Sequence, residues 1–243
     1  MRITFVGSGD AFGSGGRFNT CFHVAADRIC FLIDCGASSL IAMKRLGIDR
    51  NAIDLILLTH FHADHFGGVP FYVLDAQLVA KRTRPLTIVG PPGLAAWYER
   101  AFAATFPGER TLPFQLSLLE VTIGAANHVG ELAIVPSHVR HDDRAGPCLA
   151  YRIEVEGRTI CYSGDTEWVD TLVDVARGAD LFICECYMYD KPVRAHLALS
   201  VLRQHLPAIG AKRVILTHMS EDMLVRLGEV GYETADDGKV IEL

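Results

Sequence analysis

The chain has 243 residues, of which 50% are hydrophobic and 21% charged, so it can bury a sizeable core and is not disordered. The formal net charge of -6 excludes an overall basic field that would hold nucleic acid nonspecifically. The seven cysteines are an odd number in a chain too large to need disulfides, and no apolar run is long enough to span a membrane. We expect reduced thiols, no membrane association and a cytoplasmic protein.

Short β-branched or aromatic runs alternate with helix-like stretches along the whole chain. In the first half, the pattern predicts strands at residues 3–6, 21–24, 29–33, 55–58 and 86–89, and helices at 38–46 and 93–106. In the second half, it predicts strands at residues 132–135, 150–155, 159–162, 181–184 and 214–216, and helices at 171–177 and 197–205. Short turns at 25–28 and 156–158 predict hairpins, and therefore mixed sheets. We interpret residues 1–243 as a single domain with two similar halves, about 1–125 and 126–243.

Four side chains suited to metal binding follow the apolar strand at residues 55–58. His60, His62, Asp64 and His65 stand close together in sequence, and two glycines after them let the backbone turn away. At a strand end, His60 and His62 can point at one metal ion while Asp64 and His65 reach a second ion. Nitrogen and oxygen ligands suit zinc. A merely solvated polar loop is disfavoured, because three imidazoles and a carboxylate at the end of an apolar strand are costly to bury unpaired.

This His-x-His-x-Asp-His motif resembles that of the metallo-β-lactamase fold superfamily of metallohydrolases. Further motif positions of the superfamily appear in order over nearly the whole chain, at Asp34, at a later histidine, at Asp165 and at His218. The resemblance implies an α/β (α+β) fold, a four-layer αββα sandwich of two mixed β-sheets flanked by helices. It also implies a site at one edge, with two divalent metal ions, first of all Zn²⁺ and alternatively Mn²⁺ or Fe.

The resemblance gives each remaining position a role. Asp165, in a tight Ser-Gly-Asp-Thr turn, would bridge two cations about 3.5–4 Å apart. His218 would be the last ligand of the second ion, and Asp34 would orient a ligand by accepting its N–H without touching the metal. Plain structural alternatives are a turn carboxylate for Asp165, a backbone-bonded histidine for His218 and a helix cap for Asp34.

The third histidine of the first ion has two candidates, His138 and His141. Only one of them is needed beside His60, His62 and Asp165. We prefer His141, because it lies nearer the next strand, as the third histidine of the superfamily usually does. His138 stays open as the alternative.

Two features resemble ribonuclease Z and its phosphodiesterase relatives in particular. Glu185 followed by His196 resembles the pair that those enzymes place near their metal ions, although Leu197 stands where they carry a polar residue. The resemblance implies catalytic roles for Asp64, Glu185 and His196, with His196 delivering a proton to the leaving group. A helix-start histidine bonded to backbone is the alternative for His196.

The Gly-rich opening of the chain is the second such feature, with Ser8, Arg17 and Asn19 as candidate substrate-binding residues. Backbone N–H groups and a guanidinium could hold phosphate there, or the glycines could simply allow close packing. The basic run at residues 81–84 could also touch phosphate, although a solvated loop is the stronger interpretation.

Together these features favour a dinuclear metal-dependent hydrolase that cleaves a phosphodiester by a metal-bridging hydroxide. The substrate would be a small-molecule phosphodiester or RNA, and a homodimer is open. Only 23 residues separate His141 from Asp165, which leaves no room for the long protruding arm of ribonuclease Z enzymes that process transfer RNA alone. Hydrolysis of a thioester, lactone or other acyl group stays open, as does a non-enzymatic metal-binding module.

Overall fold

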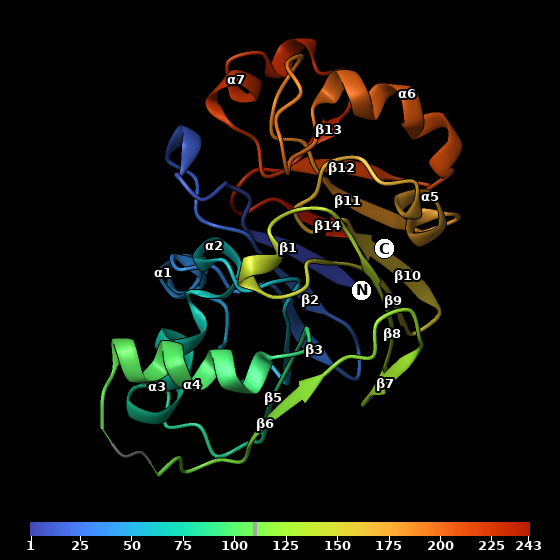
Figure 1. The fold of residues 1–243 in the computed structure, drawn as a ribbon. Helices are drawn as coiled ribbons and strands as arrows, with labels where there is room; N and C mark the ends of the chain where they lie inside the picture. The colour runs from blue at the N-terminus through green and yellow to red at the C-terminus, as the bar shows by residue number, and fades with distance from the viewer. Residues whose placement is uncertain (109–110) are drawn as a thin grey trace.

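The computed structural model describes residues 1–108 and 111–243, and these form two seven-stranded sheets that lie face to face (Figure 1). The first sheet has the order β14 (Val240–Glu242), β1 (Arg2–Gly7), β2 (Cys21–Ala25), β3 (Cys30–Ile33), β4 (Leu55–Leu57), β5 (Leu86–Gly90) and β6 (Leu116–Glu120). The second sheet has the order β13 (Glu233–Thr234), β12 (Val214–Thr217), β11 (Leu181–Glu185), β10 (Arg158–Tyr162), β9 (Leu149–Val155), β8 (Leu132–His138) and β7 (Asn127–Val129).

Helices form the two outer layers. The first sheet is accompanied by α1 (Ser39–Arg45), α2 (Ala63–Phe66), α3 (Val69–Leu78) and α4 (Leu94–Thr105). The second is accompanied by α5 (Thr171–Ala176), α6 (Leu199–Ile209) and α7 (Glu221–Leu224), and Figure 1 shows the two helix groups on opposite sides of the molecule. Three short 3₁₀ helices, η1 (Ser14–Gly16), η2 (Asp143–Ala145) and η3 (Leu227–Glu229), lie in loops. The predicted αββα sandwich is thus confirmed.

Both sheets are mixed, as the predicted hairpins require. The strands β1, β2 and β3 pair antiparallel, as do β8, β9 and β10, whereas β3 to β6 and β10 to β13 pair parallel. Parallel neighbours end at the same edge of a sheet, so the loops that follow β3, β4, β10, β11 and β12 can meet in one place.

Buried apolar side chains hold the layers together in three clusters. The central cluster lies between the sheets, and in it Phe22 makes edge-to-face contacts with Phe5 and Tyr162, each at 5.1 Å between ring centroids. The other two clusters pack α1, α3 and α4 against the first sheet and α5 and α6 against the second. Each fully buried large side chain contributes about 1.5–3 kcal/mol, so this packing fixes the edge where the strands end.

All the predicted strands and helices occur, but several elements were missed. No helix was predicted over residues 69–78, which form α3, whose buried residues Val69, Tyr72, Val73 and Ala76 have helical spacing. The strand predicted at 132–135 continues to His138, and the helix predicted at 197–205 begins at Leu199 and ends at Ile209. The strands β6, β7, β13 and β14 were not predicted, because their short, partly polar runs resemble loops.

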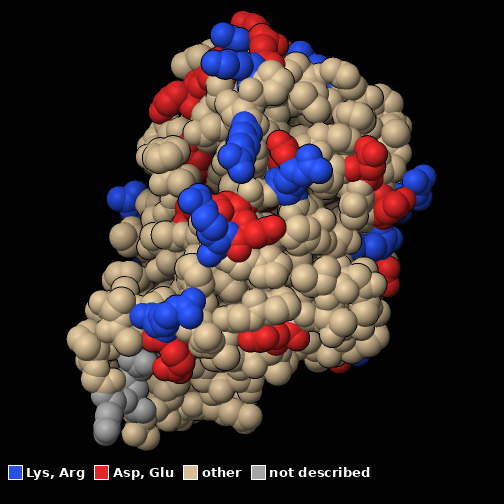
Figure 2. Space-filling view, in the orientation of Figure 1, with Lys and Arg blue, Asp and Glu red and all other residues tan. Residues whose placement is uncertain are grey.

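The basic run at residues 81–84 is not a solvated loop throughout. Arg82 is 1% exposed, and its guanidinium donates five hydrogen bonds to backbone carbonyls at 2.6–3.3 Å. It therefore fastens the connection into β5 and is not free to hold phosphate. On the face shown in Figure 2, basic and acidic side chains are intermixed.

The seven cysteines are all free, and all but Cys30 are buried, which confirms the expected thiols. No helix among the described residues combines the length and the hydropathy that a membrane crossing requires.

Candidate metal centre

The loop after β4 is packed tightly against the turn after β3. The Cys35 N–H donates to the His65 carbonyl at 2.7 Å, and the Gly68 N–H donates to the Cys35 carbonyl at 2.9 Å. A Cβ on Gly36 would lie 2.1 Å from the Asp64 carbonyl oxygen, so only glycine allows this approach. Gly67 and Gly68 have ordinary helical φ angles of -62° and -78°, and a Cβ on Gly68 would lie 2.2 Å from the Gly36 carbonyl oxygen. The motif side chains are therefore held on a rigid backbone.

Three histidines converge from two parts of the chain. His62 Nδ1 lies 3.2 Å from His60 Nε2 and 3.0 Å from His141 Nε2. His141 Nδ1 lies 2.8 Å from the Ala195 carbonyl oxygen, and His60 Nδ1 lies 3.0 Å from the Thr59 hydroxyl oxygen. Burial, together with the neighbouring histidines, lowers the pKa of His60 and of His62. Their imidazoles are therefore neutral, which is the form that binds a metal ion.

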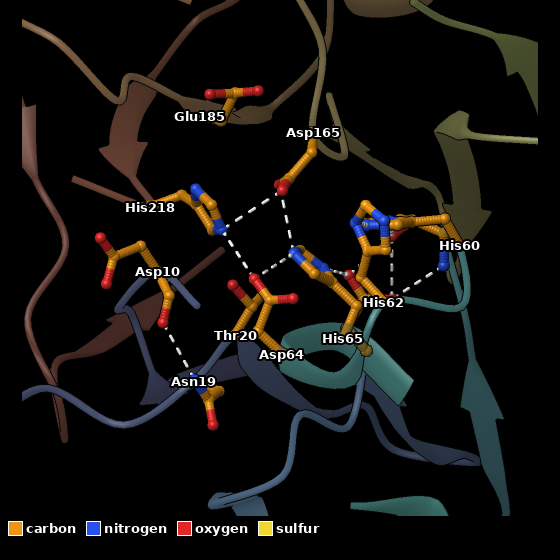
Figure 3. A network of polar contacts seen from close by, with 12 residues as sticks. Asp10, Asn19, Thr20, His60, His62, Asp64, His65, Asp165, Glu185 and His218 are labelled. Atoms are coloured by element: carbon orange, nitrogen blue, oxygen red, sulfur yellow. Dashed lines mark hydrogen bonds and ion pairs between the residues drawn. The ribbon is translucent and has the colours of Figure 1, made fainter. Parts of the chain in front are cut away.

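Beside this group, Asp64, His65, Asp165 and His218 form a second, fully buried cluster (Figure 3). His218 Nε2 lies 3.2 Å from Asp64 Oδ2 and 3.3 Å from Asp165 Oδ2. His65 Nε2 lies 3.4 Å from Asp64 Oδ2 and 3.2 Å from Asp165 Oδ1. The four side chains thus point at one another.

Asp165 stands between the two groups. It follows Gly164, which has a left-handed φ of +57°. A Cβ added to Gly164 would lie 2.5 Å from the Leu149 carbonyl oxygen, so both the conformation and the close approach require glycine. Besides its contacts in the second cluster, Asp165 Oδ2 lies 3.8 Å from His141 Nε2 of the first. One carboxylate therefore faces both groups.

Asp34 lies behind His65. Its Oδ2 accepts from His65 Nδ1 at 2.7 Å, and its Oδ1 accepts from the Thr59 N–H at 2.8 Å. The side chain is fully buried, and its backbone is left-handed, with a φ of +58°. With Nδ1 occupied in this way, His65 presents Nε2 to the cluster.

The charges of the second cluster suit a cation. Burial opposes ionisation of Asp64 and Asp165, but the His65 and His218 imidazoles beside them hold the pKa of each carboxyl well below its usual range. In turn, the carboxylates raise the pKa of His65 and His218 despite burial. His65 Nε2 and Asp165 Oδ1 are buried without a hydrogen-bond partner among the described residues. Such orphaned atoms in a nitrogen and oxygen donor set fit a divalent metal ion that displaces the protons.

Glu185 and His196 lie next to this cluster. The Glu185 carboxylate is fully buried and accepts a hydrogen bond from the Thr166 N–H. Both of its oxygens lie 3.2 Å from His196 Nδ1. The ring of Tyr187 stacks on His196, with 4.7 Å between centroids. Glu185 thus fixes the orientation of His196, whose ring centroid is 5.5 Å from that of His218 and 4.9 Å from that of His141.

Of the two candidates for the third histidine, His141 lies in the cluster and His138 does not. His138 ends β8 with an exposed side chain, 3.1 Å from Asp143. The strand continues further than predicted, so the loop begins only after His138, and this loop carries His141 back to His62.

Ser8, Arg17 and Asn19 have their polar atoms engaged within the protein. Ser8 donates to Asp237, Arg17 donates to the Ala235 carbonyl at 2.9 Å, and Asn19 donates to the Asp10 carbonyl at 2.9 Å. These contacts brace the N-terminal loop, and the predicted substrate-binding role of the three residues stays a prediction.

A cleft of about 740 Å³ opens beside the metal cluster. The residues lining it include His62, His141 and His196 together with the arginines Arg140, Arg144 and Arg194. Ligand pockets commonly span about 300–1,000 Å³, so the cleft can admit a small molecule to the metal ligands.

Sequence reasoning missed Thr59, Tyr187 and Ala195 as parts of this site. Thr59 directly precedes the motif, and Tyr187 comes two residues after Glu185, so both had a positional signal. Ala195 acts through its carbonyl oxygen on His141, and a backbone group leaves no trace in residue type.

Comparisons with known proteins agree with this geometry. Ribonuclease Z of Agathobacter rectalis is 27% identical over 278 residues, covering 92% of this chain and 89% of that protein. Ribonuclease Z of Methanothermobacter thermautotrophicus is 26% identical over 270 residues, covering 90% and 87%. The predicted resemblance to ribonuclease Z is thus confirmed.

Solved structures share the fold over the whole chain. The metallo-β-lactamase fold protein YhfI from Bacillus subtilis has a TM-score of 0.80 at 20% identity, covering 100% of this chain and 99% of that one. The short form of human tRNase Z has a TM-score of 0.78 at 24% identity, with the same coverage. The sequence model of the family described as "Anti-Pycsar protein Apyc1" matches residues 1–234. The chain therefore belongs to the Apyc1 family of anti-Pycsar proteins, with the metallo-β-lactamase fold.

Proposed function

We propose that this protein is a metal-dependent hydrolase that cleaves a phosphodiester bond in a small molecule. The observation that carries the proposal is the pair of adjacent donor groups that share Asp165, with a Glu185–His196 pair beside them. His60, His62 and His141 would hold one divalent ion, Asp64, His65 and His218 a second, and Asp165 both. Nitrogen and carboxylate donors favour Zn²⁺, with Mn²⁺ and Fe as alternatives.

Bound in this way, the ions supply a hydroxide near neutral pH and polarise the phosphoryl oxygen. Residues of the chain would orient the nucleophile and protonate the leaving group. Asp64 stays ionised, because the His65 and His218 imidazoles beside it lower its pKa, and it would orient the nucleophile by accepting a hydrogen bond from it. Its loss is expected to lower turnover at least ~10²-fold, the size of effect of a missing acid/base or electrostatic group.

His196 is the proton donor to the leaving group in this proposal. Burial opposes its positive charge, but the Glu185 carboxylate beside it raises the pKa of His196 to about 9. At neutral pH the imidazole is therefore protonated, with Nδ1 held by Glu185 and Nε2 left for the leaving oxygen. A phosphodiester needs such a donor, because its alkoxide leaving group is a strong base.

The cleft favours a phosphodiester over a thioester or lactone. Three arginines line it, and guanidinium groups match phosphate oxygens in charge and geometry. The ribonuclease Z relatives, named for an action on RNA, make RNA the second candidate substrate, whereas the short connection between His141 and Asp165 favours a small molecule.

The test is hydrolysis of bis(p-nitrophenyl) phosphate and of p-nitrophenyl acetate by protein loaded with zinc or manganese. We expect metal-dependent turnover of the phosphodiester that chelation abolishes and Asp64→Asn lowers at least ~10²-fold. Asp75→Asn is the matched control, because Asp75 is a buried carboxylate bound to Lys44 and Arg50, apart from the metal ligands. Turnover of the acetate alone would instead establish an acyl hydrolase.

A further inference from the structure

The cleft beside the metal ligands contains one arginine without a partner. Arg144 is bound by Asp142 through two hydrogen bonds at 2.8 and 2.7 Å, and Arg140 lies 3.3 Å from Glu167. Arg194 also lines the cleft, and its exposed side chain makes no ion pair or hydrogen bond with any described residue. Of the three cleft arginines, it is therefore the one whose charge no described residue engages.

A tight turn presents Arg194 at the cleft. Val193 and His196 form an antiparallel bridge, with Arg194 and Ala195 between them. Ala195 has a φ of +71°, in the left-handed region that residues other than glycine rarely adopt. The surrounding structure holds this conformation, because the Ala195 carbonyl lies 2.8 Å from His141 Nδ1. The turn that carries Arg194 is thus tied to the candidate metal ligand His141 through the Ala195 carbonyl and closed by the bridge between Val193 and His196.

This placement has a consequence for the substrate. If the proposed function holds, the scissile phosphodiester, which carries one negative charge, would lie against the metal ligands, where bound cations would offset that charge. An additional fixed cation in a cleft of about 740 Å³ then suits a second anionic group on the same molecule. We propose that Arg194 binds a phosphate adjacent to the scissile phosphodiester, so that the enzyme selects phosphodiesters carrying a further phosphate. The inference rests on the proposed function, because it extends the same site.

The test compares the dinucleotide thymidylyl-(3′→5′)-thymidine with its 5′-phosphorylated and 3′-phosphorylated forms, in the metal-loaded enzyme. For a phosphorylated form we expect Arg194→Gln to raise KM about 10–100-fold with kcat within twofold, the range of one lost charge-assisted contact. KM for the unphosphorylated dinucleotide should stay within twofold. Arg177→Gln is the control, because Arg177 lies at the C-terminal end of α5 and pairs with Asp174. It should leave KM unchanged for both kinds of dinucleotide.

The outcomes separate the alternatives. An equal rise in KM for all three dinucleotides would place Arg194 at the scissile phosphate and overturn the inference, as would no change for any of them. A free phosphate group is distinguished from a neighbouring internucleotide phosphate by including the trinucleotide, which carries a second diester and no terminal phosphate. If Arg194→Gln raises KM for the trinucleotide alone, the second group at Arg194 is an internucleotide phosphate of an oligonucleotide. That result would contradict the preference for a terminal phosphate.

Calorimetric titration with thymidine 3′,5′-bisphosphate gives a readout that does not depend on turnover. We expect Arg194→Gln to weaken the binding of the bisphosphate to the metal-loaded protein at least tenfold. Arg177→Gln should bind it with the wild-type affinity. If bis(p-nitrophenyl) phosphate is not hydrolysed while this difference persists, the proposed function fails and the anion site stands. Equal binding by the wild-type protein and Arg194→Gln overturns the site itself.

Discussion

Replacing Asp34 with asparagine changes one hydrogen bond behind the metal ligands and leaves the shape of the side chain intact. Asp34 accepts from the Thr59 N–H, from the Thr59 hydroxyl and from His65 Nδ1. An amide oxygen can still accept from Thr59, but the amide nitrogen then faces the N–H of His65, donor against donor. Asparagine is also among the residues that best tolerate the left-handed backbone of this position, at a φ of +58°, so the substitution adds little strain.

The expected effect on metal binding follows from that single lost contact. A hydrogen bond to a charged partner contributes about 1.5–3 kcal/mol, and the loss of a group that orients a ligand weakens metal binding by about 10–100-fold. The second range corresponds to about 1.4–2.7 kcal/mol, so the two figures agree. We therefore expect Asp34→Asn to bind zinc about 10–100-fold more weakly than the wild-type protein.

Competition with a chromophoric chelator measures this affinity, and thermal unfolding in excess chelator measures the stability of the metal-free chain. Asp75→Asn is the control, because it removes a buried carboxylate that lies 2.7 Å from Lys44 and 2.8 Å from Arg50. It should lower stability and leave zinc affinity within twofold. A folded Asp34→Asn protein with wild-type zinc affinity would refute the orienting role of Asp34.

Three further changes test other parts of the structure. His141→Ala should lose bound metal, as measured by elemental analysis, and His138→Ala should keep it; the reverse would make His138 the ligand. Arg82→Ala should lower the free energy of unfolding in urea by about 2–5 kcal/mol, because it leaves several carbonyls without their buried donor; an unchanged midpoint would show that water replaces the guanidinium. Tyr187→Phe should keep kcat within twofold whereas Tyr187→Ala lowers it, because the ring stacks on His196; equal losses would assign the effect to the hydroxyl.

The sequence pattern predicted the sheets well because their strands are buried on both faces or alternate clearly. The strands β4 and β11 are wholly buried, and apart from Glu185 at the end of β11 they are continuous apolar segments between polar turns. By contrast, β7 and β13 have two or three partly exposed residues, and their pairing depends on neighbours that local composition does not reveal. Short edge strands of this kind are determined by tertiary contacts.

The candidate site divides in the same way. His60, His62, Asp64 and His65 are neighbours in sequence, so their spacing alone brings them together. His141 was preferred to His138 through the family resemblance, because the residues alone do not show that β8 ends at His138 or that the distant Ala195 carbonyl lies beside His141. The partner of an arginine such as Arg82 or Arg194 is equally hidden, since a basic side chain can be a buried clamp or a free charge.

The donor atoms at the centre come from both sheets, and this makes a bound ion a cross-link between them. Asp64 and His65 follow β4 of the first sheet, whereas Asp165 and His218 follow β10 and β12 of the second. A metal ion held by all four opposes separation of the sheets as well as local fraying, and at 1,000 times its dissociation constant it adds about 4 kcal/mol to folding. The unfolding temperature should accordingly rise with metal concentration, and the two halves should unfold together when the site is filled.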